Sequence, residues 1–470
     1  MGTISAAFSI MTQALDADQA ALNVVANNVA NANTPGYTTE APNFQQNQPL
    51  EIGGTSYGDG VTETGATSVR DRVLTERLNQ QQQLASSTGA QLTALNTVQA
   101  LFTPDSGSSS ATAGDISSDL TGFFNSFSSL EANPANNSLR EEVLSSASTL
   151  ASDVSNAAAS LNSQRSALDQ EASGVTSQVN SLTGAIAQLD QQIQSTSPDA
   201  DAGTLEDQRQ QDLSQLSQLI GINQITTENN GISVTTTSGQ PLVSEGQSFQ
   251  LTTGTVNGVT HFFVGGADIT AQMASGGGQL GGYLTARDQD IPNVLGSLDQ
   301  LANSVSTQVN ALNNAGTDLA GDNGNAGDIF FQPAQVAGSA ASMRVVMTDP
   351  NHIAAAGAGQ GTGDNSNATA MAALGNQMIV NGQSPTDYFA NLVSQLGATV
   401  SNVQTENTAA NASVTQLQTQ SNALSAVNLN DEASAMSTFE RSYQAASQVF
   451  TMLNTLMASV LNLGEQSTVS

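Results

Sequence analysis

Residues 436–463 read MSTFERSYQAASQVFTMLNTLMASVLNL, and they carry the pattern that decides the fold. Apolar side chains recur in steps of three and four, which is the spacing of one face of a coiled-coil helix. A second row, made by Val449, Leu456 and Leu463, runs beside the first. Because one partner helix covers only one row, this helix must pack against more than one neighbour. The first row consists of Met436, Phe439, Tyr443, Ala446, Phe450, Leu453, Met457 and Val460.

The beginning of the chain carries a similar apolar row, broken only where Asp18 takes an apolar place. Asp431 and Glu432 put negative charge at the start of the last helix, where the helix dipole favours it. We predict terminal helices at 1–36 and 429–470 that form the core of a polymer; the alternative is the ordinary core of a helical bundle. We expect subunit packing through Phe8, Met11, Leu15, Leu22, Val25 and Val29 in the first helix and through Met436, Phe439, Tyr443, Phe450, Leu453, Met457 and Val460 in the second.

The interior of the chain predicts an elongated helical body. A third heptad region lies between Pro134 and Pro198, and a helix of about 55 residues would be ~80 Å long, far beyond the width of an ordinary globule. Further helices are predicted at 72–102, 204–220, 288–314 and 386–424. The fold class that follows is α+β and multidomain, with coiled-coil-like terminal helices and a discontinuous helical domain.

A small β domain is predicted within this helical body. Between 222 and 275 the apolar period changes to the alternation of strands, and the dipeptides Asn230-Gly231 and Asn257-Gly258 favour tight type I′ hairpins. We predict an outer β domain at 222–282. The helical body then comprises 37–221 and 283–428. Loops with short strands are expected at 38–69 and 315–384, which are rich in Gly, Asn, Gln, Ser and Thr.

Composition excludes several partners and chemistries. Nine arginines stand against forty carboxylates, which gives a formal net charge of −31, and the arginines are scattered singly, so we expect no nucleic acid and no membrane as partner. The chain has no lysine, which removes the usual phosphate loop and Schiff-base chemistry. The first twenty residues lack a basic region and a continuous apolar run, so they predict no cleavable secretion signal.

No motif predicts catalysis, a cofactor or a metal site. The chain has no cysteine and two histidines, His261 and His352, which we interpret as structural. The run GGGQLG at 276–281 matches a dinucleotide-binding spacing, but it lacks the surrounding strand and helix, so a glycine-rich hinge explains it. The run at 322–328 suggests a calcium loop but lacks the oxygen at the third position and the glutamate at the twelfth, which favours an exposed turn.

Both ends of the chain resemble bacterial flagellar axial proteins, the rod, hook and hook-associated proteins. The stretch ALNVVANNVANANTPGYTTE at 21–40 is similar to their N-terminal signature, and VNLNDEASAMSTFERSYQAASQVF at 427–450 is similar to their C-terminal one. Stretches at 205–222, 278–316 and 363–374 resemble the flagellar hook-associated protein 1 family in particular. The signature residues are Asn27, Asn28, Ala30, Asn31, Thr34, Gly36 and Tyr37 at one end and Asn428, Leu429, Glu432, Tyr443, Gln444 and Ala445 at the other.

The resemblance implies a structural subunit, not an enzyme, that forms the junction between hook and filament. It implies self-association, contacts with the hook protein and with a second junction protein on the filament side, and a cytoplasmic export chaperone at the C-terminal helix. It also implies type III export, so that the protein is transiently cytoplasmic and finally extracellular on the flagellum. The alternatives are another axial protein, such as a hook or distal rod subunit, and a secreted coiled-coil adhesin.

Overall fold

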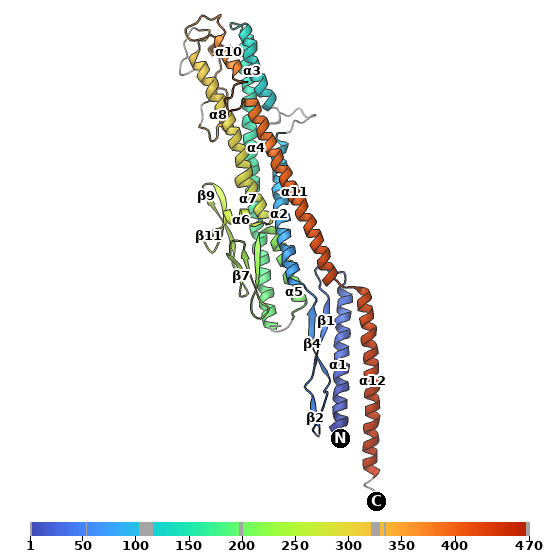
Figure 1. Cartoon of the computed structure of the whole chain (residues 1–470). Coiled ribbons are helices and arrows are strands. Elements are labelled where there is room, and N and C mark those ends of the chain that lie inside the picture. The colour runs from blue at the N-terminus through green and yellow to red at the C-terminus, as the bar shows by residue number, and fades with distance from the viewer. Residues whose placement is uncertain are drawn as a thin grey trace.

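The computed structural model describes residues 2–52, 54–102, 116–196, 201–320, 330–332 and 335–466. Long helices run along one axis of an elongated molecule, and both ends of the chain lie together at one extremity (Figure 1). Small antiparallel sheets accompany the helices. The predicted α+β class is therefore confirmed. None of the described helices combines the length and the apolar character that crossing a membrane requires.

The terminal helices form an antiparallel pair at that extremity. Helix α1 (Gly2–Asn31) packs along α12 (Leu429–Gln466), and the rings of Phe8 and Phe450 lie 4.4 Å apart. Two short hairpins lie beside α1 (Figure 1). From the sequence we assigned 37–221 to the helical body, but residues 40–68 lie instead along α1, because the strands pack on that helix. Their strands are β1 (Glu40–Gln46) paired with β4 (Val61–Ser68), and β2 (Leu50–Ile52) paired with β3 (Thr55–Tyr57).

The body is built from long helices around one apolar core. Helix α4 (Asn137–Thr196) has 60 residues, about 90 Å at 1.5 Å per residue, close to the predicted length. Helix α3 (Ile116–Ala132) packs on α4, and its rings Phe123 and Phe127 lie against Phe330 and Phe331. All four of these side chains are fully buried. The other body elements are α2 (Arg72–Ala100), α5 (Thr204–Leu219), α8 (Ile291–Ala315), α9 (Ser339–Ser342), the 3-10 turn η3 (Pro350–His352), α10 (Ser366–Ala373) and α11 (Pro385–Ser425).

The predicted β domain contains two antiparallel sheets that lie against α4 and share a second apolar core with it. The strands end at Asp268, and helices occupy the rest of the interval to residue 282. The elements are β5 (Ile222–Thr226), β6 (Ile232–Thr236), β7 (Pro241–Ser244), β8 (Gln247–Ser248), β9 (Leu251–Val256), β10 (Val259–Val264), β11 (Ala267–Asp268), α6 (Thr270–Gly276), α7 (Gly278–Thr285) and the π-helix η2 (Ala286–Asp290).

One of the two predicted hairpin turns lies one residue away from its predicted place. Asn257 and Gly258 have φ values of 51° and 81°, as a type I′ turn requires. In the other turn the left-handed residues are Asn229 and Asn230, at 54° and 57°, and the N–H of Gly231 donates to the Glu228 carbonyl. Asparagine tolerates this conformation, so the Asn-Asn pair takes the centre that we assigned to Asn-Gly.

The glycine run and the histidines have structural roles in the fold. Gly277 and Gly278 adopt φ values of 93° and 71° between α6 and α7, and a Cβ on Gly278 would lie 2.5 Å from the backbone of Ile220. Only glycine allows the chain to turn and pack this closely, which agrees with a hinge. His261 lies 2.6 Å from Asp268, and His352 lies 3.1 Å from Asp318. The calcium-like run at 322–328 lies outside the described residues.

Candidate functional site: the terminal helices and their joint

The seam between α1 and α12 contains most of the residues predicted to pack. Val25 is buried at 2% exposure, and Ala446 of α12 is buried at 9%. Asp18, which interrupts the α1 row, is also buried, and its Oδ2 atom has no hydrogen-bond partner among the described residues. The half-buried members of the two rows are Phe8, Met11, Leu15, Leu22, Met436, Phe439, Phe450, Leu453 and Met457.

Three predicted packing residues are exposed in the single chain, namely Val29 at 41%, Tyr443 at 39% and Val460 at 45%. Because α1 and α12 are antiparallel and Phe8 faces Phe450, the position level with Val460 falls just before the first residue of α1. The described part of α1 therefore does not cover that side chain. Tyr443 is level with the part of α1 where Asp18 interrupts the apolar row.

A second apolar row of α12 faces solvent along its lower half. Val449 is 41% exposed, Met452 61% and Leu456 56%, although all three are large apolar side chains. With 3.6 residues per turn they lie on one flank of the helix, beside the row that faces α1. Two residues of the predicted second row, Val449 and Leu456, are therefore uncovered in the single chain, and the side chain of the third, Leu463, lies outside the described residues. We call Val449, Met452, Leu456 and Val460 the free flank of α12.

Asn28 is the centre of the joint where the terminal helices meet the body. Its amide Nδ2 donates to the Glu40 carbonyl at 2.8 Å and to Glu432 Oε1 at 3.0 Å. Its Oδ1 accepts from the Tyr37 hydroxyl at 2.8 Å and from the Glu40 N–H at 3.0 Å. One buried side chain thus holds the end of α1, the following turn, the start of β1 and the start of α12.

The other signature residues shape the chain around this centre. The Asn31 amide donates to Asn27 Oδ1 at 2.8 Å, and the Thr34 hydroxyl donates to Asn31 Oδ1 at 3.2 Å. Gly36 has a φ of 82°, a left-handed value that glycine adopts without strain. Asn428 accepts from the Asn430 N–H at 3.1 Å and so caps α12, while Leu429, at 54% exposure, begins the helix without being buried.

Ion pairs connect the joint to helix α5 of the body. Arg70 Nη1 lies 2.5 Å from Glu206 Oε2, and its Nη2 lies 2.5 Å from Asp207 Oδ1. Asp207 also accepts from the N–H and the hydroxyl of Thr38, at 2.9 and 2.7 Å. Asp201 accepts from the N–H and the hydroxyl of Ser68, at 2.6 and 3.1 Å. The joint is therefore polar, unlike the apolar core of the body.

The sequence did not indicate the second half of this joint. Thr38 and Asp207 are 169 residues apart, and Arg70 and Glu206 are 136 apart. No local spacing connects side chains over such separations. Glu432 was interpreted as a charge at a helix N-terminus, and its contact with Asn28 spans 404 residues. The one available signal was the scarcity of cations, since the few arginines stand in a large excess of carboxylates with which they could pair.

The carboxylates of the joint outnumber its arginines, and this changes the ionisation of two groups. Burial raises the pKa of Tyr37, and the charges of Glu40, Asp207 and Glu432 raise it further. The pKa of Glu40 is raised by burial and by Asp201 and Asp207, while a hydrogen bond from Asn27 and the charge of Arg70 act in the opposite direction. Both groups therefore favour their neutral forms more than they do in water.

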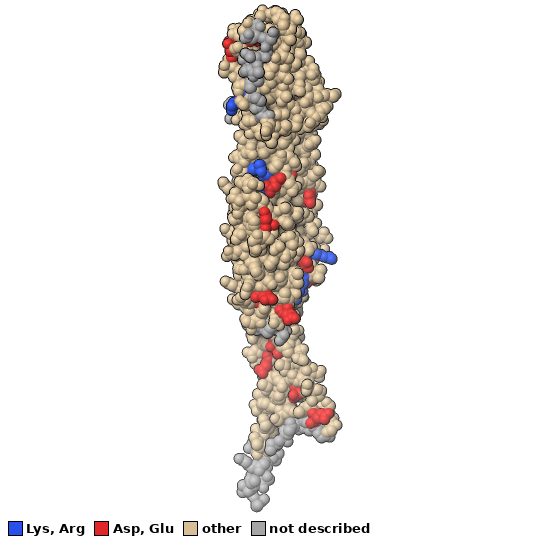
Figure 2. Space-filling view, turned by 90° about the vertical axis from the view of Figure 1, so that its left-hand side faces the viewer, with Lys and Arg blue, Asp and Glu red and all other residues tan. Residues whose placement is uncertain are grey.

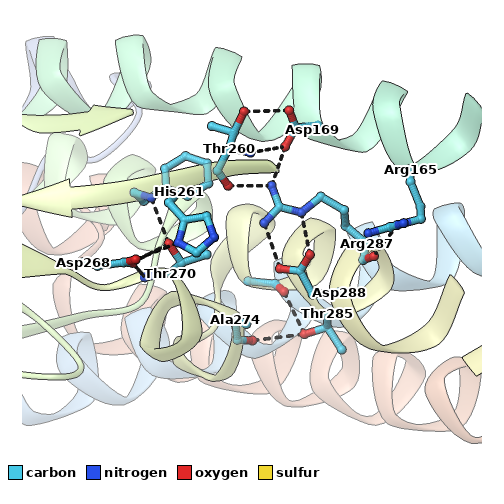
Figure 3. A network of polar contacts seen from close by, with 12 residues as sticks. Arg165, Asp169, Thr260, His261, Asp268, Thr270, Ala274, Thr285, Arg287 and Asp288 are labelled. Carbon is cyan, nitrogen blue, oxygen red and sulfur yellow. Dashed lines mark hydrogen bonds and ion pairs between the residues drawn. The ribbon is translucent and has the colours of Figure 1, made fainter. Parts of the chain in front are cut away.

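A second polar network fastens the β domain to the body (Figure 3). Arg287 of η2 is 2% exposed, and its guanidinium pairs with Asp288 and with Asp169 of α4 and donates to the Thr260 carbonyl of β10 at 2.9 Å. Asp268 accepts from the backbone N–H and the hydroxyl of Thr270, and these bonds, helped by His261, lower the pKa of Asp268 to about 2. This network joins three elements and has the form of a structural clamp.

The described residues contain no constellation that suggests catalysis. Among them, no group of three or more histidine or carboxylate side chains could hold a metal ion. A cleft of about 810 Å³ between α2, α4, α5 and α7 is lined mainly by small and amide side chains, including Gln164, Gln178 and Gln215. On the face shown in Figure 2 the charged patches are small and scattered over a mostly uncharged surface. The terminal helices and their joint remain the strongest candidate site.

Comparisons with known proteins relate the chain to flagellar proteins. Residues 105–331 match the family described as flagellar hook-associated protein FlgK helical domain, and residues 10–38 match the flagella basal body rod protein family. Flagellar hook-associated protein 1 of Bacillus subtilis (strain 168) is 28% identical, over 96% of each chain. The same-named protein of Escherichia coli (strain K12) is 26% identical over 67% of this chain and 58% of its own length, so the chain spans little more than half of that relative.

A solved structure shares the fold. It is titled as the flagellar hook junction protein FlgK from Burkholderia pseudomallei, and it superposes with a TM-score of 0.63 at 20% sequence identity. The match covers 73% of this chain and 99% of the solved one. At this identity the likeness establishes the arrangement of elements alone. The sequence matches at 10–38 include Asn27, Asn28, Asn31, Thr34, Gly36 and Tyr37, the residues that build the joint.

Proposed function

Because the chain belongs to the flagellar hook-associated protein 1 family, we propose that it is a structural subunit that forms the junction between hook and filament by self-assembly of its terminal helices. The observation that carries the proposal is the free flank of α12. Four large apolar side chains are 41–61% exposed on a helix whose other apolar row is already occupied by α1. Covering them in a neighbouring copy gains burial that a single chain cannot reach.

The proposal includes the partners and the location that the family implies. The copies would sit between the hook protein and a second junction protein on the filament side, outside the cell. Before export through the flagellar type III channel, a cytoplasmic chaperone would cover the free flank of α12, since an exposed apolar row invites premature association. We propose no enzymatic activity and no cofactor, because the described side chains serve packing and clamping.

A pair of matched substitutions tests the self-assembly. Leu456→Asp places a charge on the free flank, whereas Ile225→Asp places the same charge on β5 at a nearly equal exposure, 58% against 56%. Both residues are exposed in the single chain, so both variants should melt within a few degrees of the wild type. In cells that lack the chromosomal copy, Leu456→Asp should leave hooks without filaments, and Ile225→Asp should restore motility. Normal filaments with Leu456→Asp would overturn the proposal.

A second test uses the free chain, because the terminal pair buries a far smaller share of its side chains than the body does. We expect limited proteolysis of the purified chain to trim it back to the region of Tyr37 and Asn428 while the body stays intact. Assembled junctions should resist the same treatment. Equal resistance of both extremities in the dilute, free chain would contradict an order that depends on assembly.

A hook or distal rod subunit is the second candidate, and the basal body rod protein match at 10–38 favours it. That match covers only the shared N-terminal segment, whereas the hook-associated match covers 105–331. A secreted adhesin has no comparable support.

A further inference from the structure

The body contains a long cleft whose lining residues all belong to α2, α4, α5 and α7. Its volume is about 810 Å³, which is within the range of pockets that bind small molecules, about 300–1,000 Å³. Along α4 the cleft extends from Gln164 to Leu182, which corresponds to about 27 Å at 1.5 Å per residue. The cleft is therefore long enough for a ligand made of several linked units.

The floor and the rim of this cleft differ in polarity. Ala90, Ala94 and Leu168 are its deeply buried apolar residues, at 9%, 2% and 2% exposure. Gln178 and Gln215 are exposed, and no hydrogen bond joins their amides to other described residues. Each amide presents two N–H donors and a carbonyl acceptor. The rim can therefore form several hydrogen bonds to a ligand that rests on a small apolar floor.

Tyr283 lines the cleft between two polar partners. The Gln279 amide donates to its hydroxyl at 2.8 Å. Burial raises the pKa of Tyr283, and the charge of Glu171 and a hydrogen bond with it raise this pKa further. The hydroxyl therefore stays protonated and is held from both sides. A ring fixed in this way offers a ligand an apolar face beside a polar edge.

The lining favours a neutral ligand that is not a peptide. Glu171 is the one charged side chain among the described residues that line the cleft, so an anion finds no cation to pair with. An extended peptide adds to the edge of a sheet, but these walls are helices. A helical peptide needs an apolar groove and a proline-rich one needs several aromatic rings, whereas the rim here is made of amides.

We propose that this cleft binds a neutral oligosaccharide that contains N-acetylated amino sugars. Sugar hydroxyls supply the hydrogen-bond partners that the glutamine amides do not find within the chain. An acetamido group adds a carbonyl and an N–H that pair with one amide, and its methyl group fits the floor at Ala90 and Ala94. The ring of Tyr283 lies against the apolar face of one sugar. Because glycoside hydrolysis ordinarily uses two carboxylates, the single Glu171 gives binding without cleavage.

Titration of the purified full chain with soluble sugars tests the proposal. The probe is chitohexaose, a β-linked oligomer of N-acetylglucosamine, and the comparison is maltohexaose, a neutral oligomer of equal length without acetamido groups. Isothermal titration calorimetry should give a dissociation constant below about 1 mM for chitohexaose and binding at least about tenfold weaker for maltohexaose. Because the cleft is nearly uncharged, the affinity should change less than about twofold between about 0.01 and 1 M salt.

Filling the cleft shows whether the sugar binds there. Thr93 is exposed on the α2 wall, so Thr93→Phe places a ring in the cleft and should weaken chitohexaose binding by at least about tenfold. Thr149→Phe makes the same change at an exposed threonine of α4 outside the cleft and should bind as the wild type does. Both positions are exposed, so both variants should melt within a few degrees of the wild type.

A second pair of variants tests the amides without adding bulk. Gln178→Ala removes one rim amide and should weaken chitohexaose binding about three- to tenfold. Gln170→Ala makes the same change at an exposed glutamine of α4 that does not line the cleft, and its affinity should equal that of the wild type. Equal losses in the two variants would mean that the rim amides do not contact the sugar.

Several outcomes would overturn the proposal. Absence of chitohexaose binding, or binding that Thr93→Phe leaves unchanged, would remove the sugar from this cleft. Equal affinity for maltohexaose would contradict recognition of the acetamido group. A peptide rich in serine and asparagine that binds while chitohexaose does not would assign the cleft to a polypeptide. The proposal goes beyond the junction function and does not rest on it, since sugar binding is measured on the free chain and filament assembly in cells.

Discussion

Helices α8 and α12 carry similar apolar spacing but differ in what covers them. Helix α8 has 25 residues, and eleven of them are buried inside the body. Helix α12 has 38 residues, and among those whose exposure is described only Glu432 and Ala446 are buried. Apolar periodicity therefore predicts a helix equally well in both regions, but it does not say whether the covering partner belongs to the same chain. The body covers its apolar row within one chain, whereas the terminal pair leaves part of its apolar surface exposed.

The largest difference should appear when an aromatic ring is removed from each region. Phe127 is fully buried among other rings, so Phe127→Ala should lower the unfolding free energy of the body by about 3–5 kcal/mol. Phe450 is half-buried and touches Phe8, so Phe450→Ala should leave the body transition unchanged and affect the terminal pair alone. Urea unfolding followed by circular dichroism measures both. Equal losses in the two variants would break the comparison.

The second-largest effect is expected at the joint between the terminal pair and the body. Arg70→Ala leaves the carboxylates of Glu206 and Asp207, 2% and 10% exposed, without their main cation. Breaking a buried ion pair from one side costs about 3–5 kcal/mol, reduced here because Arg72 lies 3.7 Å from Glu206. Hydrogen exchange should accelerate at Thr38 and Ser68, whereas Arg77→Ala, at an exposed arginine of the following helix α2, should change nothing. Unchanged exchange in Arg70→Ala would show that the pair does not hold the joint.

The sequence predicted the features that depend on local spacing and missed those that depend on contacts between distant parts of the chain. The 60-residue helix α4, the two rows of α12 and the inserted sheets were predicted, because periodicity is a local property of the chain. The hairpins along α1 were placed with the wrong neighbour, because short polar strands carry no signal of what they pack on. Asn28 was recognised through resemblance, but its role needed the tertiary structure, which brings Tyr37 and Glu432 to one amide.

A substitution within the α1 row should strengthen the terminal pair. Asp18 occupies an apolar place in the seam, and its buried Oδ2 has no partner among the described residues, which costs about 1–3 kcal/mol. Asp18→Leu should recover part of this cost and slow the hydrogen exchange of α1 and α12 in the free chain, without changing the body. Asp16→Leu removes the same charge at an exposed position of the same helix and should stay within about 0.5 kcal/mol. Faster exchange in Asp18→Leu would mean that the aspartate stabilises the seam.

The smallest effect should be the pH dependence of the joint. The pKa of Glu40 is raised in the folded chain, so its contribution to stability is fully present below its unfolded pKa and is lost as pH rises through the folded value. Glu40→Gln keeps the neutral form at every pH. The melting temperature of the terminal pair should therefore fall less between pH 4 and pH 7 in this variant than in the wild type, and the change is modest because Glu40 is half-exposed.

The exposed Glu51 of β2 supplies the control, since Glu51→Gln removes one carboxylate from the same hairpins away from Asp201 and Asp207. Its pH profile should follow that of the wild type. If Glu51→Gln flattens the profile as much as Glu40→Gln does, the dependence comes from the overall negative charge of the extremity and not from the joint. A Glu40→Gln profile that matches the wild type would instead mean that the crowding of carboxylates around Asn28 does not weaken the attachment of the terminal helices to the body.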